Sequence, residues 1–190
     1  MKAKVIIIHG AYGHPEENWF PWLKTQMMHS GIECYVPSFP TPEGQHLHSW
    51  IKIFNEIYSA HGDAHTILIG HSLGAVFLLN WLERHVCRPS AVILAGAFLG
   101  KTGIAKFDDI NVDFFQQPFQ WDVIKSRSDR FICYHGDDDP YVSRSSFEFI
   151  ADKLQALKVV ISQGGHLNAA AGYIEFPQLW QQVKVLLKLI

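Results

Sequence analysis

Three side chains that can act together in acyl transfer occur in this sequence at Ser72, Asp139 and His166. Ser72 is the centre of the pentapeptide Gly-His-Ser-Leu-Gly at 70–74, which lies between an apolar run and a long hydrophobic stretch. Between a strand and a helix, this Gly-x-Ser-x-Gly pattern is typical of a nucleophile elbow, a tight turn that exposes a serine hydroxyl. A serine hydroxyl is a weak nucleophile that needs a histidine to accept its proton and a carboxylate to orient that histidine. The chain supplies both residue types downstream of Ser72.

The carboxylate is ambiguous at first sight, because aspartates occupy positions 137, 138 and 139. Asp139 is favoured because it lies three residues after Gly136 and three before Val142, which resembles the Gly-x-x-Asp-x-x-Val pattern of the acid loop in α/β-hydrolases. Pro140 also biases the residue before it toward an extended backbone. His166 on its own would be interpreted as a solvated loop histidine, but together with Ser72 and Asp139 it is predicted to be the proton acceptor.

The elements that must position these residues alternate between apolar strand-like runs and amphipathic helical stretches. Strands are expected at 4–9, 33–36, 65–69, 91–95, 130–134 and 158–161, and helices at 21–30, 47–58, 73–82, 147–157 and 176–187. We therefore expect a three-layer α/β/α sandwich with a six-stranded parallel sheet in the order 2-1-3-4-5-6. Ser72, Asp139 and His166 each follow an expected strand, so all three are predicted at one carboxyl edge of the sheet.

Length and composition predict a single domain over residues 1–190. A chain of 190 residues with 48% hydrophobic content can bury one core and is too short for two domains of typical size. Within it, segment 97–128 has no sustained period and carries several aromatic residues. Two interpretations are open for this segment: a small cap over a pocket, or satellite packing against the body.

Several function classes are disfavoured by charge and residue usage. The net charge is -2 without a lysine or arginine run, so no nucleic-acid partner is expected. The apolar run at 5–8 is too short for a signal peptide or a membrane span, which predicts no membrane partner and a cytoplasmic location. Cys34, Cys87 and Cys133 lack CxxC spacing, and no HExxH motif occurs among the histidines, so neither a disulfide, a metal nor a cofactor is expected.

Motifs along nearly the whole chain carry a family resemblance. They are His9-Gly10, Asn18-Trp19-Phe20-Pro21-Trp22-Leu23, the pentapeptide at 70–74, Phe114-Phe115 to Phe119 and Trp121, Asp139-Pro140, and Gly165-His166. On these residues the chain resembles small α/β-hydrolases and, more narrowly, the retinoblastoma-binding protein nine family of serine hydrolases with its bacterial relatives. The resemblance implies a catalytic triad and a minimal six-stranded sheet. The member that gives the family its name binds retinoblastoma protein through Leu-x-Cys-x-Glu, a sequence that no cysteine of this chain occupies, so that partner is not expected.

The expected reaction is carboxylesterase-like hydrolysis of a small-molecule acyl substrate, an ester, through an acyl-enzyme on Ser72. The oxyanion hole is expected from the backbone N–H groups of Leu73 and Ala11. A peptidase or thioesterase using the same triad, or a non-catalytic interaction module on a hydrolase scaffold, are the alternatives.

Four aromatic side chains are candidates for the substrate pocket: Tyr12, Trp19, Phe98 and Phe119. For Tyr12 and Trp19, packing within the loop is an equally good interpretation.

Overall fold

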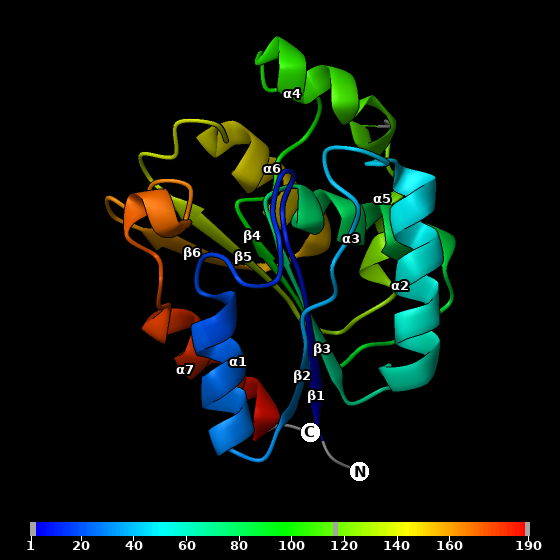
Figure 1. The fold of residues 1–190 in the computed structure, drawn as a ribbon, viewed down its shortest axis with the longest axis vertical. Helices are drawn as coiled ribbons and strands as arrows, with labels where there is room; N and C mark the ends of the chain where they lie inside the picture. Colours follow the sequence, from blue (N-terminus) through cyan, green and yellow to red (C-terminus); the bar gives the residue numbers. More distant parts are fainter. Residues whose placement is uncertain (1–2, 116–117, 189–190) are drawn as a thin grey trace.

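A parallel β-sheet forms the centre of the computed structural model, which describes residues 3–115 and 118–188 (Figure 1). Its six strands are β1 (Lys4–Ile8), β2 (Glu33–Tyr35), β3 (Thr66–His71), β4 (Ala91–Ala95), β5 (Phe131–Gly136) and β6 (Leu157–Ile161). They lie in the order β2-β1-β3-β4-β5-β6, and each neighbouring pair is parallel. The predicted fold class and strand order are confirmed.

The central strands are apolar on both faces because helices cover both sides of the sheet. In β1, Val5 and Ile7 contribute to one hydrophobic cluster, and Ile6 and Ile8 contribute to the other. Successive side chains of a strand point to opposite faces, so a strand buried on both faces has a continuous apolar sequence. β6 lies at the edge of the sheet and alternates between exposed and half-buried residues instead.

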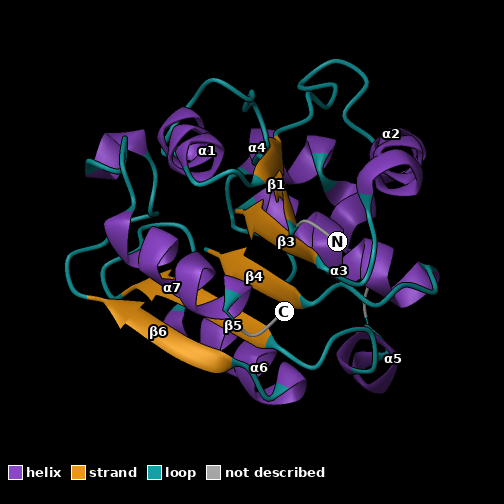
Figure 2. Ribbon diagram, turned by 90° about the horizontal axis from the view of Figure 1, so that it is seen from below, coloured by secondary structure: helices purple, strands orange, loops and turns teal. Residues whose placement is uncertain are grey.

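Figure 2 shows the two helical layers on either side of the sheet. α1 (Phe20–His29) and α7 (Pro177–Leu187) pack on one face, and α2 (Leu47–His61), α3 (Leu73–Arg84) and α6 (Arg144–Leu154) on the other. α3 is buried from its first residue through Leu82, which explains why its sequence is apolar on nearly every side. Within the described residues, no helix combines the length and the apolar character needed to cross a membrane.

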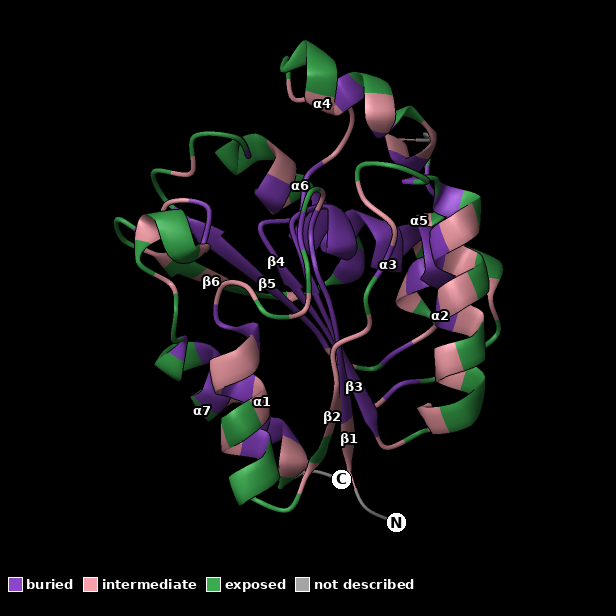
Figure 3. Cartoon of the chain, in the orientation of Figure 1, coloured by how far each residue is buried: buried purple, intermediate pink, exposed green. Residues whose placement is uncertain are grey.

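Segment 97–128 contains α4 (Ala105–Ile110), the 3-10 helix η1 (Val112–Phe115) and α5 (Trp121–Lys125). The cap interpretation fits the first part of this segment, and the interpretation as packing against the body fits the second part. α4 projects beyond the carboxyl edge of the sheet and is largely exposed (Figure 3). Phe114, Phe119 and Ile124 are instead buried in the hydrophobic cluster that also contains residues of α2, α3 and α6. Residues 116–117 of this expected cap lie outside the described residues.

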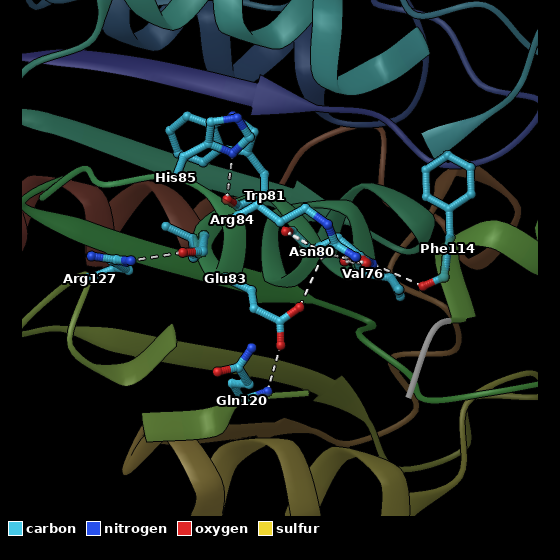
Figure 4. A network of polar contacts seen from close by, with 10 residues as sticks. Val76, Asn80, Trp81, Glu83, Arg84, His85, Phe114, Gln120 and Arg127 are labelled. Atoms are coloured by element: carbon cyan, nitrogen blue, oxygen red, sulfur yellow. Dashed lines mark hydrogen bonds and ion pairs between the residues drawn. The ribbon is translucent and has the colours of Figure 1, made fainter. Parts of the chain in front are cut away.

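Polar contacts from side chains of α3 hold the second part of this segment (Figure 4). The side-chain amide of Asn80, which is fully buried, donates a hydrogen bond to the backbone carbonyl of Phe114 at 2.9 Å. The carboxylate of Glu83 accepts one from the backbone N–H of Gln120. Because η1 and the start of α5 are both tied to α3, this part of the segment belongs to the body of the protein.

Element boundaries differ from the sequence predictions in ways that local contacts explain. β3 continues to His71, so residues 70–71 are strand rather than turn. β5 continues to Gly136, which pairs with Ile161 of β6. α6 begins at Arg144 rather than at 147, because the Ser143 hydroxyl accepts a hydrogen bond from the N–H of Ser146 and caps the helix.

Candidate active site

Ser72 lies in a strained turn between β3 and α3. Its backbone has φ 55° and ψ −121°, a combination that residues with a Cβ rarely adopt. A Cβ added to Gly70 would lie 2.6 Å from the backbone of α3, and one added to Gly74 would collide with the carbonyl oxygens of Ile8 and His9. The turn therefore requires glycine on both sides of the serine.

His166 connects Ser72 to Asp139 through both ring nitrogens. Its Nε2 lies 2.9 Å from the Ser72 Oγ, and its Nδ1 lies 2.8 Å from the Asp139 Oδ2. Because an ionised carboxylate can only accept hydrogen bonds, Nδ1 carries the hydrogen and Nε2 accepts from the serine hydroxyl. Ser72 is 9% exposed and His166 is 8% exposed, so this chain of hydrogen bonds is largely shielded from bulk water.

The surroundings of Asp139 keep it ionised. Burial on its own raises the pKa of this carboxyl, but hydrogen bonds and the attraction of His166 outweigh burial and hold the pKa below its ordinary value. Oδ2 accepts from His166, while Oδ1 accepts from the backbone N–H groups of Tyr141 at 2.9 Å and Val142 at 3.0 Å. The loop thus holds the carboxylate with its second oxygen directed at the histidine.

The other two aspartates bind the backbone of the loop that carries His166. Asp137 Oδ1 accepts from the N–H of Gln163 at 2.8 Å, and Asp138 Oδ1 accepts from the N–H of Gly165 at 2.7 Å. Of the three consecutive aspartates, Asp139 is therefore the one that contacts the imidazole ring.

The backbone N–H groups of Leu73 and Ala11 lie at the same edge of the sheet. Leu73 is the first residue of α3, so its N–H has no acceptor within the helix. Ala11 follows Gly10, where an added Cβ would lie 3.1 Å from the Ser72 Cβ and 3.6 Å from its Oγ. Within residues 3–115 and 118–188, neither N–H donates a hydrogen bond. Among the described residues, both N–H groups are therefore without an acceptor.

His9 holds the loop that contains Ala11. Its Nδ1–H donates to the carbonyl of Gly10 at 2.8 Å, which leaves Nε2 to accept from the backbone N–H of Phe39 at 3.0 Å. Burial lowers the pKa of His9, so its imidazole is neutral, as these two contacts require.

A cavity of about 300 Å³ opens beside Ser72 and His166. Its other lining residues are predominantly apolar or aromatic: Tyr12, Phe98, Thr102, Ile104, Lys106, Phe107, Tyr141 and Val142. Small-molecule sites in proteins typically combine such apolar walls with a few polar groups.

Tyr12 and Phe98 line this cavity, but the expectation that Trp19 and Phe119 do so is wrong. Trp19 is fully buried on the α1 and α7 face of the sheet, where its indole N–H donates to the carbonyl of Leu167 at 3.0 Å. Phe119 is buried in the core on the opposite face. Both rings fill space between helices and sheet, so neither reaches the cavity.

The cap interpretation of 97–128 included α4, but sequence reasoning did not single out the cavity residues of this segment or those after the aspartates. Ile104, Lys106 and Phe107 belong to a segment without periodicity, so no sequence signal identified them. Tyr141 and Val142 lie two and three residues after Asp139, and that position could have suggested them.

This molecule has the architecture of an α/β-hydrolase. Its sheet is parallel, its serine lies in a sharp strand-to-helix turn, and an aspartate and a histidine that follow later strands contact each other and the serine. The chain belongs to the serine hydrolase family, whose model matches residues 5–185. The family resemblance predicted from the motifs is thereby confirmed.

Relatives of similar length extend this comparison. The serine hydrolase RBBP9 of Rattus norvegicus is 26% identical over 187 residues, covering 98% of this chain and 95% of its own. The protein YdeN of Bacillus subtilis (strain 168) is 26% identical over 179 residues, covering 93% and 92%. Among solved structures, the ydeN gene product of B. subtilis superposes with a TM-score of 0.90 at 23% identity, over 98% of this chain and all (100%) of that chain. The carboxylesterase CesB of Bacillus subtilis shares the fold at a TM-score of 0.68 and 14% identity, over 98% and 84%.

Proposed function

We propose that this protein hydrolyses small carboxylic esters through an acyl-enzyme formed on Ser72. The observation that carries the proposal is the continuous hydrogen-bonded chain Ser72–His166–Asp139 at the wall of an apolar cavity. In this catalytic triad, Ser72 is the nucleophile of the elbow, and His166 takes its proton as the hydroxyl attacks the ester carbonyl. Asp139 keeps the required tautomer of His166 and stabilises the imidazolium that forms.

The proton on His166 then passes to the oxygen of the leaving alcohol as the ester C–O bond breaks, which leaves the acyl group on Ser72. A water molecule attacks this acyl-enzyme while His166 accepts a proton from the water. His166 returns that proton to Ser72 when the carboxylic acid leaves, so the enzyme is regenerated unchanged.

The oxyanion that forms at each attack needs preorganised donors. The free N–H groups of Leu73 and Ala11 suit this role, because Leu73 follows Ser72 directly and Ala11 follows Gly10, which closely approaches Ser72. A donor of this kind stabilises the transition state by about 3–4 kcal/mol. The N–H groups are backbone atoms, so the turn and the His9 loop supply them without a dedicated side chain.

The cavity supports an acyl group of modest size. Its walls are mainly rings and branched aliphatic side chains, and about 300 Å³ is at the small end of ligand pockets. An ester with an apolar acyl group suits this space, with the alcohol directed to the open side.

Covalent labelling and substrate comparison test the proposal. A fluorophosphonate probe should label the wild-type protein once, at Ser72, and p-nitrophenyl esters of short fatty acids should be hydrolysed with a burst of p-nitrophenol. Matched butanoyl substrates with oxygen, sulfur or anilide leaving groups compare the bond types. Faster turnover of the thioester or the anilide would favour thioesterase or peptidase chemistry, and absence of labelling would favour a non-catalytic protein.

A further inference from the structure

We infer that the cavity beside Ser72 selects acyl groups by charge and favours a chain that ends in a carboxylate over one that ends in an ammonium group. This inference rests on the proposed ester hydrolysis at Ser72. Among the described residues that line the cavity, Lys106 is the only lysine, arginine, aspartate or glutamate. A bound acyl group therefore meets one positive charge and no negative charge.

Two carboxylates, Asp108 and Asp109, belong to the same helix as Lys106, and neither lines the cavity. Asp108 accepts hydrogen bonds from the N–H and hydroxyl of Thr102 at 2.8 and 2.9 Å and from the N–H of Gly103 at 2.9 Å. Burial alone raises the pKa of Asp108, but these bonds outweigh it and lower the pKa, so Asp108 is a charged anchor for the loop before α4. It is buried rather than placed in the cavity wall.

Asp139, the carboxylate of the proposed triad, also does not contact the cavity. The Asp139 side chain is 0% exposed and lies behind the His166 ring, which separates it from the cavity. An ammonium group that entered the cavity would lose hydration without gaining a carboxylate partner, and burying an unpaired charge is unfavourable.

α4 places Lys106 beside the loop that follows β1, in the wall of the cavity. The Tyr12 hydroxyl lies 3.5 Å from the Lys106 backbone carbonyl, and both residues line the cavity. Lys106 is exposed and lines the cavity, so its charge lies at the solvent-facing part of the cavity wall.

Three p-nitrophenyl esters of equal chain length test the selection: those of hexanoic acid, adipic acid with its second carboxylate free, and 6-aminohexanoic acid. The readout is the ratio of kcat/KM for the adipoyl ester to that for the aminohexanoyl ester, which cancels any general change in activity. We expect a ratio of about ten at low salt, because attraction of one charge and repulsion of the other add, and a smaller ratio at high salt.

Substitutions at Lys106 test whether its charge causes this ratio of kcat/KM values. Lys106→Gln should bring the ratio close to one and Lys106→Glu should invert it, whereas Lys101→Gln, which alters a lysine outside this cavity, should leave it unchanged. Equal kcat/KM for all three esters, or a ratio that persists in Lys106→Gln, would overturn the inference while leaving ester hydrolysis intact. Failure of all three esters together with absent fluorophosphonate labelling would instead remove the proposed function itself.

A separate observation concerns His71, the residue before the nucleophile. Its Nε2 lies 2.9 Å from the backbone carbonyl oxygen of His166, so this nitrogen carries the hydrogen and donates it. His71 is 3% exposed, and in the part of the chain that the structure describes its Nδ1 has no partner. A leucine would fill similar space without burying an unpaired nitrogen, which costs free energy.

We propose that His71 is a positioning residue that fixes the His166 ring against Ser72 by holding the His166 backbone. Like the charge selection, this rests on the proposed hydrolysis. His71 and Ser72 are consecutive, so the end of β3 contacts the His166 carbonyl and the turn after it contacts the His166 ring. The ring centroids of the two histidines are 5.2 Å apart, and burial lowers the pKa of His71 to about 3. A neutral His71 adds no second positive charge when His166 becomes an imidazolium.

Two substitutions separate positioning from space filling. His71→Gln retains an amide N–H near the place of Nε2, whereas His71→Leu retains bulk without a donor. We expect His71→Leu to lower kcat about tenfold or more with KM within about twofold, and His71→Gln to recover most of the loss. The downfield Nδ1–H proton resonance of His166 should persist in His71→Gln and broaden in His71→Leu.

His135→Leu is the matched control, because His135 is also buried at a strand end, stacks on Phe147 and, among the described residues, has no hydrogen-bond partner for its Nδ1. It should lower stability without the loss in kcat. Equal kcat in His71→Leu and wild type, or equal losses in the Leu and Gln variants, would overturn the proposal. If His71→Leu fails to fold, His71→Asn serves instead, since its shorter amide cannot reach the His166 carbonyl. Higher activity in His71→Gln than in His71→Asn would support the positioning role. Equal activity of these two variants would contradict it.

Discussion

Asp138 accepts a hydrogen bond from the backbone N–H of Gly165 at 2.7 Å, one residue before the histidine that Asp139 contacts. Neighbouring aspartates therefore bind neighbouring residues of the loop after β6, one by its backbone and one by its ring. This division of roles leads to different expectations for substitutions at the two positions.

Asp139→Asn should lower turnover by about 10⁴-fold, because an amide can donate to His166 and stabilise the wrong tautomer. Asp138→Asn and Asp137→Asn should each cost less than about tenfold, since an asparagine side chain retains the oxygen that accepts from the backbone. Steady-state ester hydrolysis of the three purified variants measures these effects. A severe loss in Asp138→Asn with near-normal Asp139→Asn would transfer the acid role to Asp138.

Ser72→Ala should abolish fluorophosphonate labelling and lower ester turnover by about 10⁴- to 10⁶-fold, with a residual rate from oxyanion binding. Stability should hardly decrease, because the side chain is small and the strained φ of 55° is unfavourable for both residues. Labelling stoichiometry by mass spectrometry and a thermal unfolding curve check both parts. Undiminished labelling would place the nucleophile elsewhere.

Gly74→Ala should destabilise the protein by about 1–3 kcal/mol and lower activity, because the new methyl group would collide with the carbonyl oxygens at the end of β1. The displaced start of α3 would also shift Ser72 and the N–H of Leu73. Urea denaturation measures the stability loss. Gly31→Ala is the control, since open space surrounds Gly31 and only its φ of 72° opposes alanine.

Acid should destabilise the fold through its buried neutral histidines. Burial lowers the pKa of His9, His71 and His135 below the ordinary value of 6.5, in the case of His71 to about 3. Below about pH 6.5 the unfolded chain takes up protons that the folded chain excludes, so the free energy of unfolding falls as pH drops from about 6.5 toward 3.

One such histidine contributes up to about 1.4 kcal/mol per pH unit to this slope. Urea denaturation between pH 6 and 4.5 should therefore give a slope that is shallower by about this amount in His71→Gln than in wild type. Identical slopes would mean that His71 is protonated in the folded protein.

The sequence by itself determined the order of the strands and the edge of the sheet at which Ser72, Asp139 and His166 meet. Alternation of apolar runs with amphipathic stretches encodes which element follows which, and right-handed crossovers leave few arrangements of such elements. The glycines around Ser72 also predicted the tight turn from sequence alone, because the steric requirement of such a turn acts on contiguous residues.

The sequence favoured Asp139 as the acid and named Tyr12 and Phe98 for the cavity, but only the tertiary structure shows which aspartate contacts His166 and which other side chains form the cavity. Three consecutive carboxylates have the same chemistry, and their roles depend on a loop 26 and 27 residues further along the chain. Trp19 and Phe119 point into the two cores, whereas Lys106 and Phe107 come from a segment without periodicity. Such contacts arise from packing between segments that are distant in the sequence, so the local sequence pattern does not predict them.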